Sequence, residues 1–181
     1  MYPVAHIVVA SGAAWSVERV VRRLYRRLDR RDRENDSQPK GRSLFDYRFV
    51  ALGALLPDII DKPLAWWILA DRVEDDHLIA HTLIFALTLA LPGIYFARSG
   101  DCRLLSVAFG VALHIACDPV LRTPTTLFWP LFGWSFRDTS GNGVPIDLPT
   151  LDAIGATVAA VVLLRLWQNG RLRALVQFGQ I

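Results

Sequence analysis

The segment Phe109-Gly110-Val111-Ala112-Leu113-His114-Ile115-Ala116-Cys117-Asp118 carries an imidazole and a carboxylate within an otherwise apolar run. Because His114 and Asp118 are four residues apart, a helix places both side chains on one face, one turn apart. Burial of a polar or charged group in an apolar medium costs several kcal/mol unless the group is paired or binds a metal. The segment therefore predicts a buried helix whose polar pair either binds a metal ion or forms a hydrogen bond between packed helices.

Every other histidine also lies in or beside an apolar run. His77 and His81 are four residues apart at the start of the run that ends at Ala97, and this spacing recurs in zinc sites. Asp75-Asp76-His77 is equally typical of a solvated helix start, so the sequence favours His81 and leaves His77 open. His6 lies in the first apolar run and, taken alone, is more typical of a hydrogen-bonded core histidine than of a ligand.

A second group of polar residues lies between two prolines. Asp58, Asp61 and Lys62 occur in the segment Pro57–Pro63, within a long apolar run. Proline lacks a backbone N–H and disfavours helix at the preceding residue, so both prolines are expected to interrupt the helix. A local salt bridge between Asp61 and Lys62, with Asp58 as a helix cap, accounts for one acid but not comfortably for two at membrane depth.

The apolar residues of this 181-residue chain are concentrated in runs. Its hydrophobic content of 52% exceeds that of ordinary soluble domains, and a membrane-spanning helix needs about 20 apolar residues, with about 17 as a lower limit. The second, third and fourth runs reach that length, the fifth is marginal and the first is short. We therefore predict one all-α domain over residues 1–181, a multi-span transmembrane helical bundle with a metal site between its helices. The five runs are Val4–Val17, Phe49–Ala70, Leu78–Ala97, Leu104–Leu121 and Leu151–Trp167.

The basic residues predict the orientation of this bundle. Eleven of the 20 Lys and Arg lie between Arg19 and Arg48, where we predict a cytoplasmic helix and loop (19–48) that anchors against anionic lipid. With the N-terminus outside, sixteen Lys and Arg fall on the cytoplasmic side and three outside, which satisfies the positive-inside rule. The polar residues then lie toward the outer face of a prokaryotic inner (cell) membrane. The first residues lack a basic segment, so no cleaved signal peptide is expected.

The longest segment without a helical pattern is 122–149, which is rich in proline and glycine. A loop of this length is usually functional, and we predict that it covers the site from the extracytoplasmic side. Trp129-Pro130 belongs to this loop, because the apolar stretch Leu127–Trp134 is too short to cross a bilayer. An equally weighted alternative makes Trp129 and Trp134 interfacial anchors without contact to a substrate.

The types of donor side chain indicate the chemistry. Histidines and carboxylates without thiolates suit Zn²⁺, with Mn²⁺ or Fe²⁺ as substitutes; Cys102 and Cys117 are isolated and form no metal or disulfide framework. A bound metal lowers the pKa of a coordinated water from about 15.7 to about 7 and polarises a phosphoryl oxygen. The chain contains no Gly-x-Ser-x-Gly, P-loop or Gly-x-Gly-x-x-Gly motif. Metal-dependent hydrolysis is therefore the favoured reaction.

The polar motifs follow one another in a specific order along the chain. They are His6, Leu55-Leu56-Pro57-Asp58, Ala80-His81-Thr82, Leu113-His114-Ile115-Ala116-Cys117-Asp118 and Phe128-Trp129-Pro130. This order and spacing, over roughly residues 1–135, resemble the YdjM family of membrane-bound metal-dependent hydrolases, some of which are under LexA control. That family is in turn distantly similar to the zinc-dependent phospholipase C and single-strand nuclease superfamily, whose all-helical members bind clustered zinc ions.

The resemblance implies metal ligands from four regions of the chain: His6, Asp58, His81 or His77, His114 and Asp118. Many family members have two carboxylates separated by one residue, whereas Asp58 and Asp61 are three apart. Many also have a His-Arg-Gly stretch before the second histidine, which is absent from Asp76–His81. These departures weaken the implied roles of Asp61 and His77, and one or two metals is the expected count.

Together these features predict a membrane-bound metal-dependent hydrolase that cleaves a phosphoester, with a lipid suggested by location and analogy. Asp58 or Asp61 is the candidate general base, and Lys62 or Arg122 is the candidate that stabilises developing charge. Metal affinity should fall as pH drops through the histidine range, because the ligands must be deprotonated. One alternative is a non-enzymatic metal or proton transporter. Another, less favoured, is a membrane-anchored protein whose segment 19–48 binds nucleic acid or protein.

Overall fold

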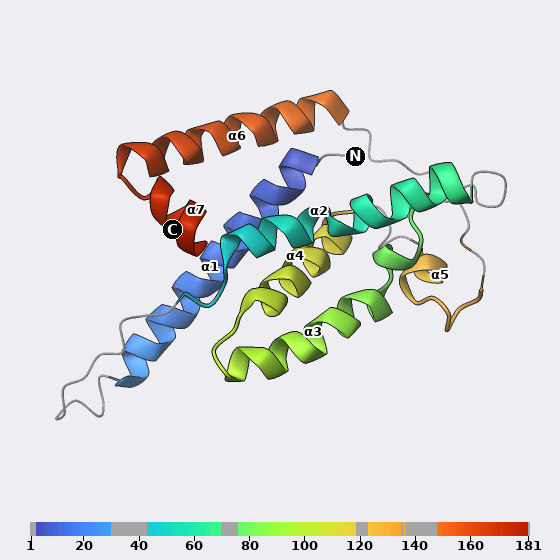
Figure 1. Cartoon of the computed structure of the whole chain (residues 1–181), viewed down its shortest axis with the longest axis horizontal. Helices are drawn as coiled ribbons and strands as arrows, with labels where there is room; N and C mark the ends of the chain where they lie inside the picture. The colour runs from blue at the N-terminus through green and yellow to red at the C-terminus, as the bar shows by residue number, and fades with distance from the viewer. Residues whose placement is uncertain are drawn as a thin grey trace.

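The computed structural model describes residues 3–29, 43–69, 76–118, 123–134, 136 and 148–180. Within these ranges every regular element is helical and none is a strand, so the all-α prediction is confirmed. Figure 1 shows the arrangement of the elements. In chain order they are α1 (Pro3–Asp29), α2 (Tyr47–Pro63), the π-helix η1 (Leu64–Ile68), the 3₁₀ turn η2 (Ile79–His81), α3 (Leu83–Arg98), α4 (Arg103–Cys117), α5 (Pro124–Leu127), α6 (Leu148–Gln168) and α7 (Leu172–Phe178).

The centre of the bundle is the pair α2 and α4. Helix α1 packs against both of them, α3 packs against α4, and α6 packs against α1 (Figure 1). The central pair approaches closely because glycine faces backbone on both sides: Gly53 faces Val107, and Gly110 faces Val50 and Ala54. A Cβ atom on either glycine would overlap the facing backbone. Glycine is the residue that allows this approach, since it has no Cβ.

Helix α1 contains the one described stretch that is long and apolar enough by itself to cross a membrane, Pro3–Leu24. Helices α6 and α7 pass the same test only as a pair, bent by 102° between Ala153–Gln168 and Leu172–Phe178. One face of α1 is buried in the bundle. Its buried residues are spaced four apart, and the 3.6-residue period of a helix places residues with this spacing in one row. These residues are His6, Ala10, Ala14 and Glu18.

The lengths of the helices reverse the ranking of the apolar runs predicted from sequence. The first run, predicted to be short, continues as helix to Asp29, whereas α3 and α4 have only 16 and 15 residues. At about 1.5 Å per residue these two helices reach about 22–24 Å, less than the roughly 30 Å of a bilayer core. The third run forms a shorter α-helix than predicted because its first residues form the 3₁₀ turn η2 before α3. The fourth stops at Asp118, whose extended backbone (φ −90°, ψ 150°) is the conformation favoured before a proline such as Pro119.

The prediction that Pro57 interrupts its helix is wrong. Helix α2 runs through Pro57 and ends at Pro63, where the π-helix η1 follows. Because proline has no N–H, the carbonyl of Gly53 loses its usual helical donor, but the helix is held by its packing on α4. Asp58 is therefore an interior residue of α2 and not a helix cap; Asp46 is the residue that caps α2.

A polar contact far from Asp58 joins the basic end of α1 to the start of α2. The buried Glu18 carboxylate accepts hydrogen bonds from Arg22, from Ser43 Oγ at 2.9 Å and from Tyr47 Oη at 2.9 Å. Burial, together with this bond, raises the pKa of the Tyr47 hydroxyl above its usual range, so it remains a donor. Of the predicted basic segment 19–48, residues 30–42 lie outside the described residues.

Candidate metal centre

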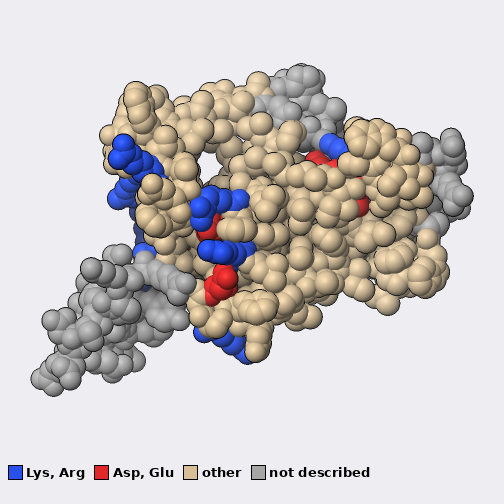
Figure 2. All heavy atoms as spheres, in the orientation of Figure 1, with Lys and Arg blue, Asp and Glu red and all other residues tan. Residues whose placement is uncertain are grey.

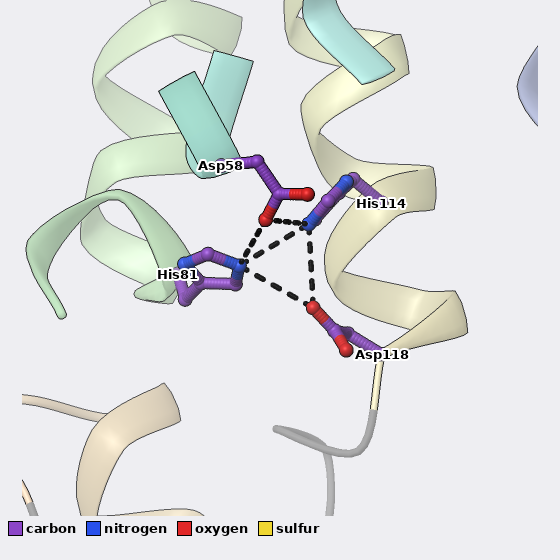
Figure 3. A group of neighbouring side chains, drawn as sticks. All are labelled: Asp58, His81, His114 and Asp118. Atoms are coloured by element: carbon purple, nitrogen blue, oxygen red, sulfur yellow. Dashed lines mark hydrogen bonds and ion pairs between the residues drawn. The ribbon is translucent and has the colours of Figure 1, made fainter. Parts of the chain in front are cut away.

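Four buried side chains from three regions of the chain meet between the helices. Asp58 comes from α2, His81 from η2, and His114 and Asp118 from the C-terminal end of α4 (Figure 3). The spacing of four residues puts His114 and Asp118 on one face of α4, as the sequence predicted. Asp118 also ends this helix, so its carboxylate projects from the last turn toward the other three residues.

The four residues each offer one ligand atom, and these atoms all lie within 4.8 Å of one another. His81 Nε2 and His114 Nε2 are 3.1 Å apart, and each lies 3.3 Å from Asp118 Oδ2. Asp58 Oδ1 lies 3.6 Å from His81 Nε2 and 3.5 Å from His114 Nε2. A tetrahedral zinc ion with bonds of about 2.0–2.2 Å separates its ligand atoms by about 3.3–3.6 Å. The group can therefore hold one metal ion of this size.

Two oxygens of the group are buried without a hydrogen bond. Neither Asp58 Oδ1 nor Asp118 Oδ2 accepts one, although both atoms are inaccessible to solvent. A buried carboxylate oxygen in that situation is costly unless a cation compensates it. Both oxygens face the two Nε2 atoms, which is the placement that a shared cation requires (Figure 3).

Hydrogen bonds on the far side of each imidazole set its orientation. His114 Nδ1 donates to the backbone carbonyl of Ala54 at 2.7 Å, and His81 Nδ1 donates to Asp61 Oδ2 at 2.8 Å. Because Nδ1 carries the proton in both neutral rings, each Nε2 turns a lone pair toward the centre. Sequence reasoning missed the Ala54 carbonyl, since a backbone acceptor has no signature of its own in the sequence.

Asp61 lies behind His81 and outside the group of four. It is fully buried, and both of its oxygens accept hydrogen bonds from the segment Leu78–His81. This placement does not support the predicted role of Asp61 as a ligand or general base, because protein donors already occupy both oxygens. The Asp61–Lys62 salt bridge of the alternative, purely structural interpretation is not formed; Lys62 Nζ instead lies 3.5 Å from Asp58 Oδ2.

The two remaining histidines pack around the group without belonging to it. The His6 ring stacks on the His114 ring, with centroids 4.2 Å apart and an interplanar angle of 28°. The His77 ring meets the His81 ring edge-on at 4.7 Å, and His77 Nε2 lies 3.4 Å from Asp118 Oδ2. All four histidines therefore converge, but the group that could hold a metal contains only His81 and His114.

Short helix α5 and the turns after it lie beside the group. Helix α5 packs against η2, the turn that carries His81. Trp129 lies in these turns, edge-on to Trp134 and stacked on Phe136, with centroids 5.6 Å apart in both pairs. Arg122 and residues 135 and 137–147 of the predicted loop 122–149 lie outside the described residues.

The described residues thus form a helical fold that has one apolar helix of spanning length and a buried His and Asp group that could hold a metal ion. The family model of the YdjM inner membrane protein matches residues 1–177, and the chain belongs to this family. No curated protein and no solved structure matches the chain.

Proposed function

We propose that this chain is a membrane-bound metal-dependent hydrolase that cleaves a phosphoester. The observation that carries the proposal is the convergence of four ligand atoms, all within 4.8 Å of one another, in a buried group with two oxygens that accept no hydrogen bond. The donor set of two imidazoles and two carboxylates suits Zn²⁺, with Mn²⁺ or Fe²⁺ as substitutes. Asp58, His81, His114 and Asp118 would hold the ion. When bound, it would act as a Lewis acid for a phosphoryl oxygen, and it would activate a water by accepting it as a ligand in addition to the four protein donors.

The charges of the group favour a divalent ion. The region contains three buried carboxylates, Asp58, Asp61 and Asp118, and one ammonium group, that of Lys62 beside Asp58; the imidazoles are counted as neutral because metal ligation requires it. Their formal net charge is −2, from three negative charges and one positive charge. A divalent cation neutralises it, and neutrality matters most where water is excluded.

We assign the remaining chemical roles to Asp58 and Lys62. Asp58 Oδ1 faces the other donors, and Asp58 Oδ2 is 3.5 Å from Lys62 Nζ. The Asp58 carboxylate can orient a water and accept its proton, which is the role of a general base. The Lys62 side chain is partly exposed and can stabilise negative charge that develops on a phosphoryl oxygen.

Two exposed tryptophans, one after α2 and one after α5, support a lipid as the source of the phosphoester. Trp67 is 81% exposed in η1, directly after the helix that carries Asp58, and Trp134 is 79% exposed in the segment after α5. Exposed tryptophan favours the interface between lipid and water, since indole has an apolar body and a polar N–H. A phosphoester whose apolar part lies in the bilayer would carry its polar part at this interface, where it could reach the site.

We further propose the multi-span arrangement with the N-terminus outside and the site toward the outer face. In Figure 2 most of the Lys and Arg in view lie in the left half of the molecule, in several patches, and one lies apart on the right. The elements that carry the candidate centre, the C-terminal part of α2, η2 and the C-terminal end of α4, lie in the right half of the same view (Figure 1). We expect cysteines introduced between residues 30 and 40 to react only with membrane-permeant reagents in intact cells. Labelling of these cysteines by an impermeant reagent would contradict the orientation.

The hydrolase proposal predicts that detergent-purified protein contains close to one equivalent of a divalent metal. It should hydrolyse a soluble aryl phosphodiester, lose activity on chelation and recover it with Zn²⁺, because the four donors form one centre. Elemental analysis and a colorimetric assay measure both quantities. Metal-loaded protein that hydrolyses no phosphoester but moves the metal across liposome membranes would instead favour the transporter.

A further inference from the structure

We infer that Asp61 is a positioning residue, which holds His81 in the orientation and tautomer that metal binding requires. The inference rests on the metal site proposed above, but not on the reaction proposed for it. It replaces the role of general base or ligand that the sequence suggested for this carboxylate.

The contacts of Asp61 converge from one short segment. Its Oδ2 accepts hydrogen bonds from the backbone N–H of Leu78 at 2.7 Å, from that of His81 at 3.2 Å and from the His81 ring Nδ1 at 2.8 Å. Its Oδ1 accepts from the backbone N–H of Ala80 at 3.0 Å. The side chain of Asp61 is 0% exposed. One carboxylate therefore binds both the imidazole and the backbone that carries it.

This support is needed because His81 lies on a weak element. The 3₁₀ turn η2 has only three residues, and the chain before it at Leu78 is not helical. Such a turn cannot by itself hold an imidazole within the tolerance of a metal site. Helix α2 supplies the missing rigidity, because Asp58 and Asp61 are three residues apart and share one face of it. The helix thus contributes one candidate ligand directly and orients a second.

The partner of His81 also differs in kind from the partner of His114. A carboxylate accepts the His81 Nδ1 proton, whereas a neutral backbone carbonyl accepts that of His114. A carboxylate partner makes an imidazole a stronger metal ligand, and loss of such a partner typically weakens metal affinity by about 10–100-fold. We therefore expect Asp61 to contribute to metal affinity and not only to folding.

The test compares Asp61→Asn with Glu18→Gln in the full-length, detergent-solubilised protein. Glu18 is a matched control: it is also a buried carboxylate with several hydrogen bonds, but it lies about three helical turns from His6 along α1. Zn²⁺ affinity is measured by competition with a chelating dye. Asp61→Asn should weaken it by about 10–100-fold, whereas Glu18→Gln should lower thermal stability without changing the affinity of the folded protein. Equal Zn²⁺ affinity in wild-type and Asp61→Asn protein would overturn the inference.

A second measurement uses the wild-type protein, so it does not depend on whether a variant folds. In wild-type protein with ¹⁵N-labelled histidine and bound Zn²⁺, the NMR signals of His81 should show a proton on Nδ1 and the metal on Nε2. A proton on Nε2 of His81 would overturn the inference independently of any substitution. Zn²⁺ binding without phosphoester hydrolysis would refute only the proposed reaction and, with the Nδ1–H tautomer, would support the role of Asp61.

Discussion

Protein carrying His114→Ala is expected to purify without bound metal and without metal-dependent hydrolysis. His114 Nε2 is one of the four donor atoms, 3.1 Å from His81 Nε2 and 3.3 Å from Asp118 Oδ2. Loss of a residue that hydrogen-bonds to a metal ligand typically weakens metal affinity by about 10–100-fold. Loss of the ligand itself should weaken it more. The substitution also removes the hydrogen bond to the Ala54 carbonyl, which contributes about 0.5–1.5 kcal/mol to the free energy of unfolding.

His6→Ala is the matched control for this substitution. His6 stacks on His114 but contributes no atom to the group that could hold a metal. We expect this variant to retain a metal content close to that of the wild type by elemental analysis. Loss of metal as complete as in His114→Ala would extend the ligand set to His6, as the family resemblance implied. Full metal content in His114→Ala would refute the centre.

Gly110→Ala is expected to destabilise the whole bundle. The added Cβ would overlap the carbonyl oxygen of Val50 and the backbone N of Ala54. Both are backbone atoms, so α2 and α4 must move apart, and overpacking of this kind costs about 1–3 kcal/mol. The shift would also displace the Ala54 carbonyl from His114 Nδ1. We therefore expect a lower midpoint of thermal unfolding in detergent together with weaker metal binding.

Gly12→Ala tests whether the effect comes from this contact or from the loss of any glycine. Gly12 lies inside α1, and a Cβ there would meet no atom within 4 Å. Alanine is favoured over glycine within a helix by about 0.5–1 kcal/mol, so this variant should match or exceed the wild type in stability. Gly110→Ala protein as stable as Gly12→Ala protein would contradict the close packing of α2 and α4.

Much of the candidate site was predictable because polar residues are rare in apolar runs. His81, His114, Asp58 and Asp118 stand out in the sequence for this reason, and the spacing of His114 and Asp118 placed both on one helical face. The same reasoning could not separate these four from His6, His77 and Asp61. All seven are polar groups in an apolar setting, and the distances between their donor atoms depend on how separate helices pack.

The lengths of the helices were predicted less well, for a related reason. Counting apolar residues does not show where the chain leaves the helix, as it does before α3 and at Asp118. Nor does it show that α2 passes through Pro57, where packing on α4 compensates for one lost hydrogen bond. Helix preferences differ by less than about 1 kcal/mol among ordinary residues and reach about 3 kcal/mol for proline, and tertiary contacts can override them.

The sequence by itself determined the all-α class, the family and the residues from which a metal centre could be built, because composition and periodicity are local properties of the chain. Only the tertiary structure decided which of those residues share a centre. Gly53 and Gly110 let α2 approach α4 until Asp58 lies 3.5 Å from His114 Nε2. The packing of α2 against η2 then turned Asp61 toward the far side of His81. These outcomes depend on how segments remote in sequence pack against one another, which no local pattern encodes.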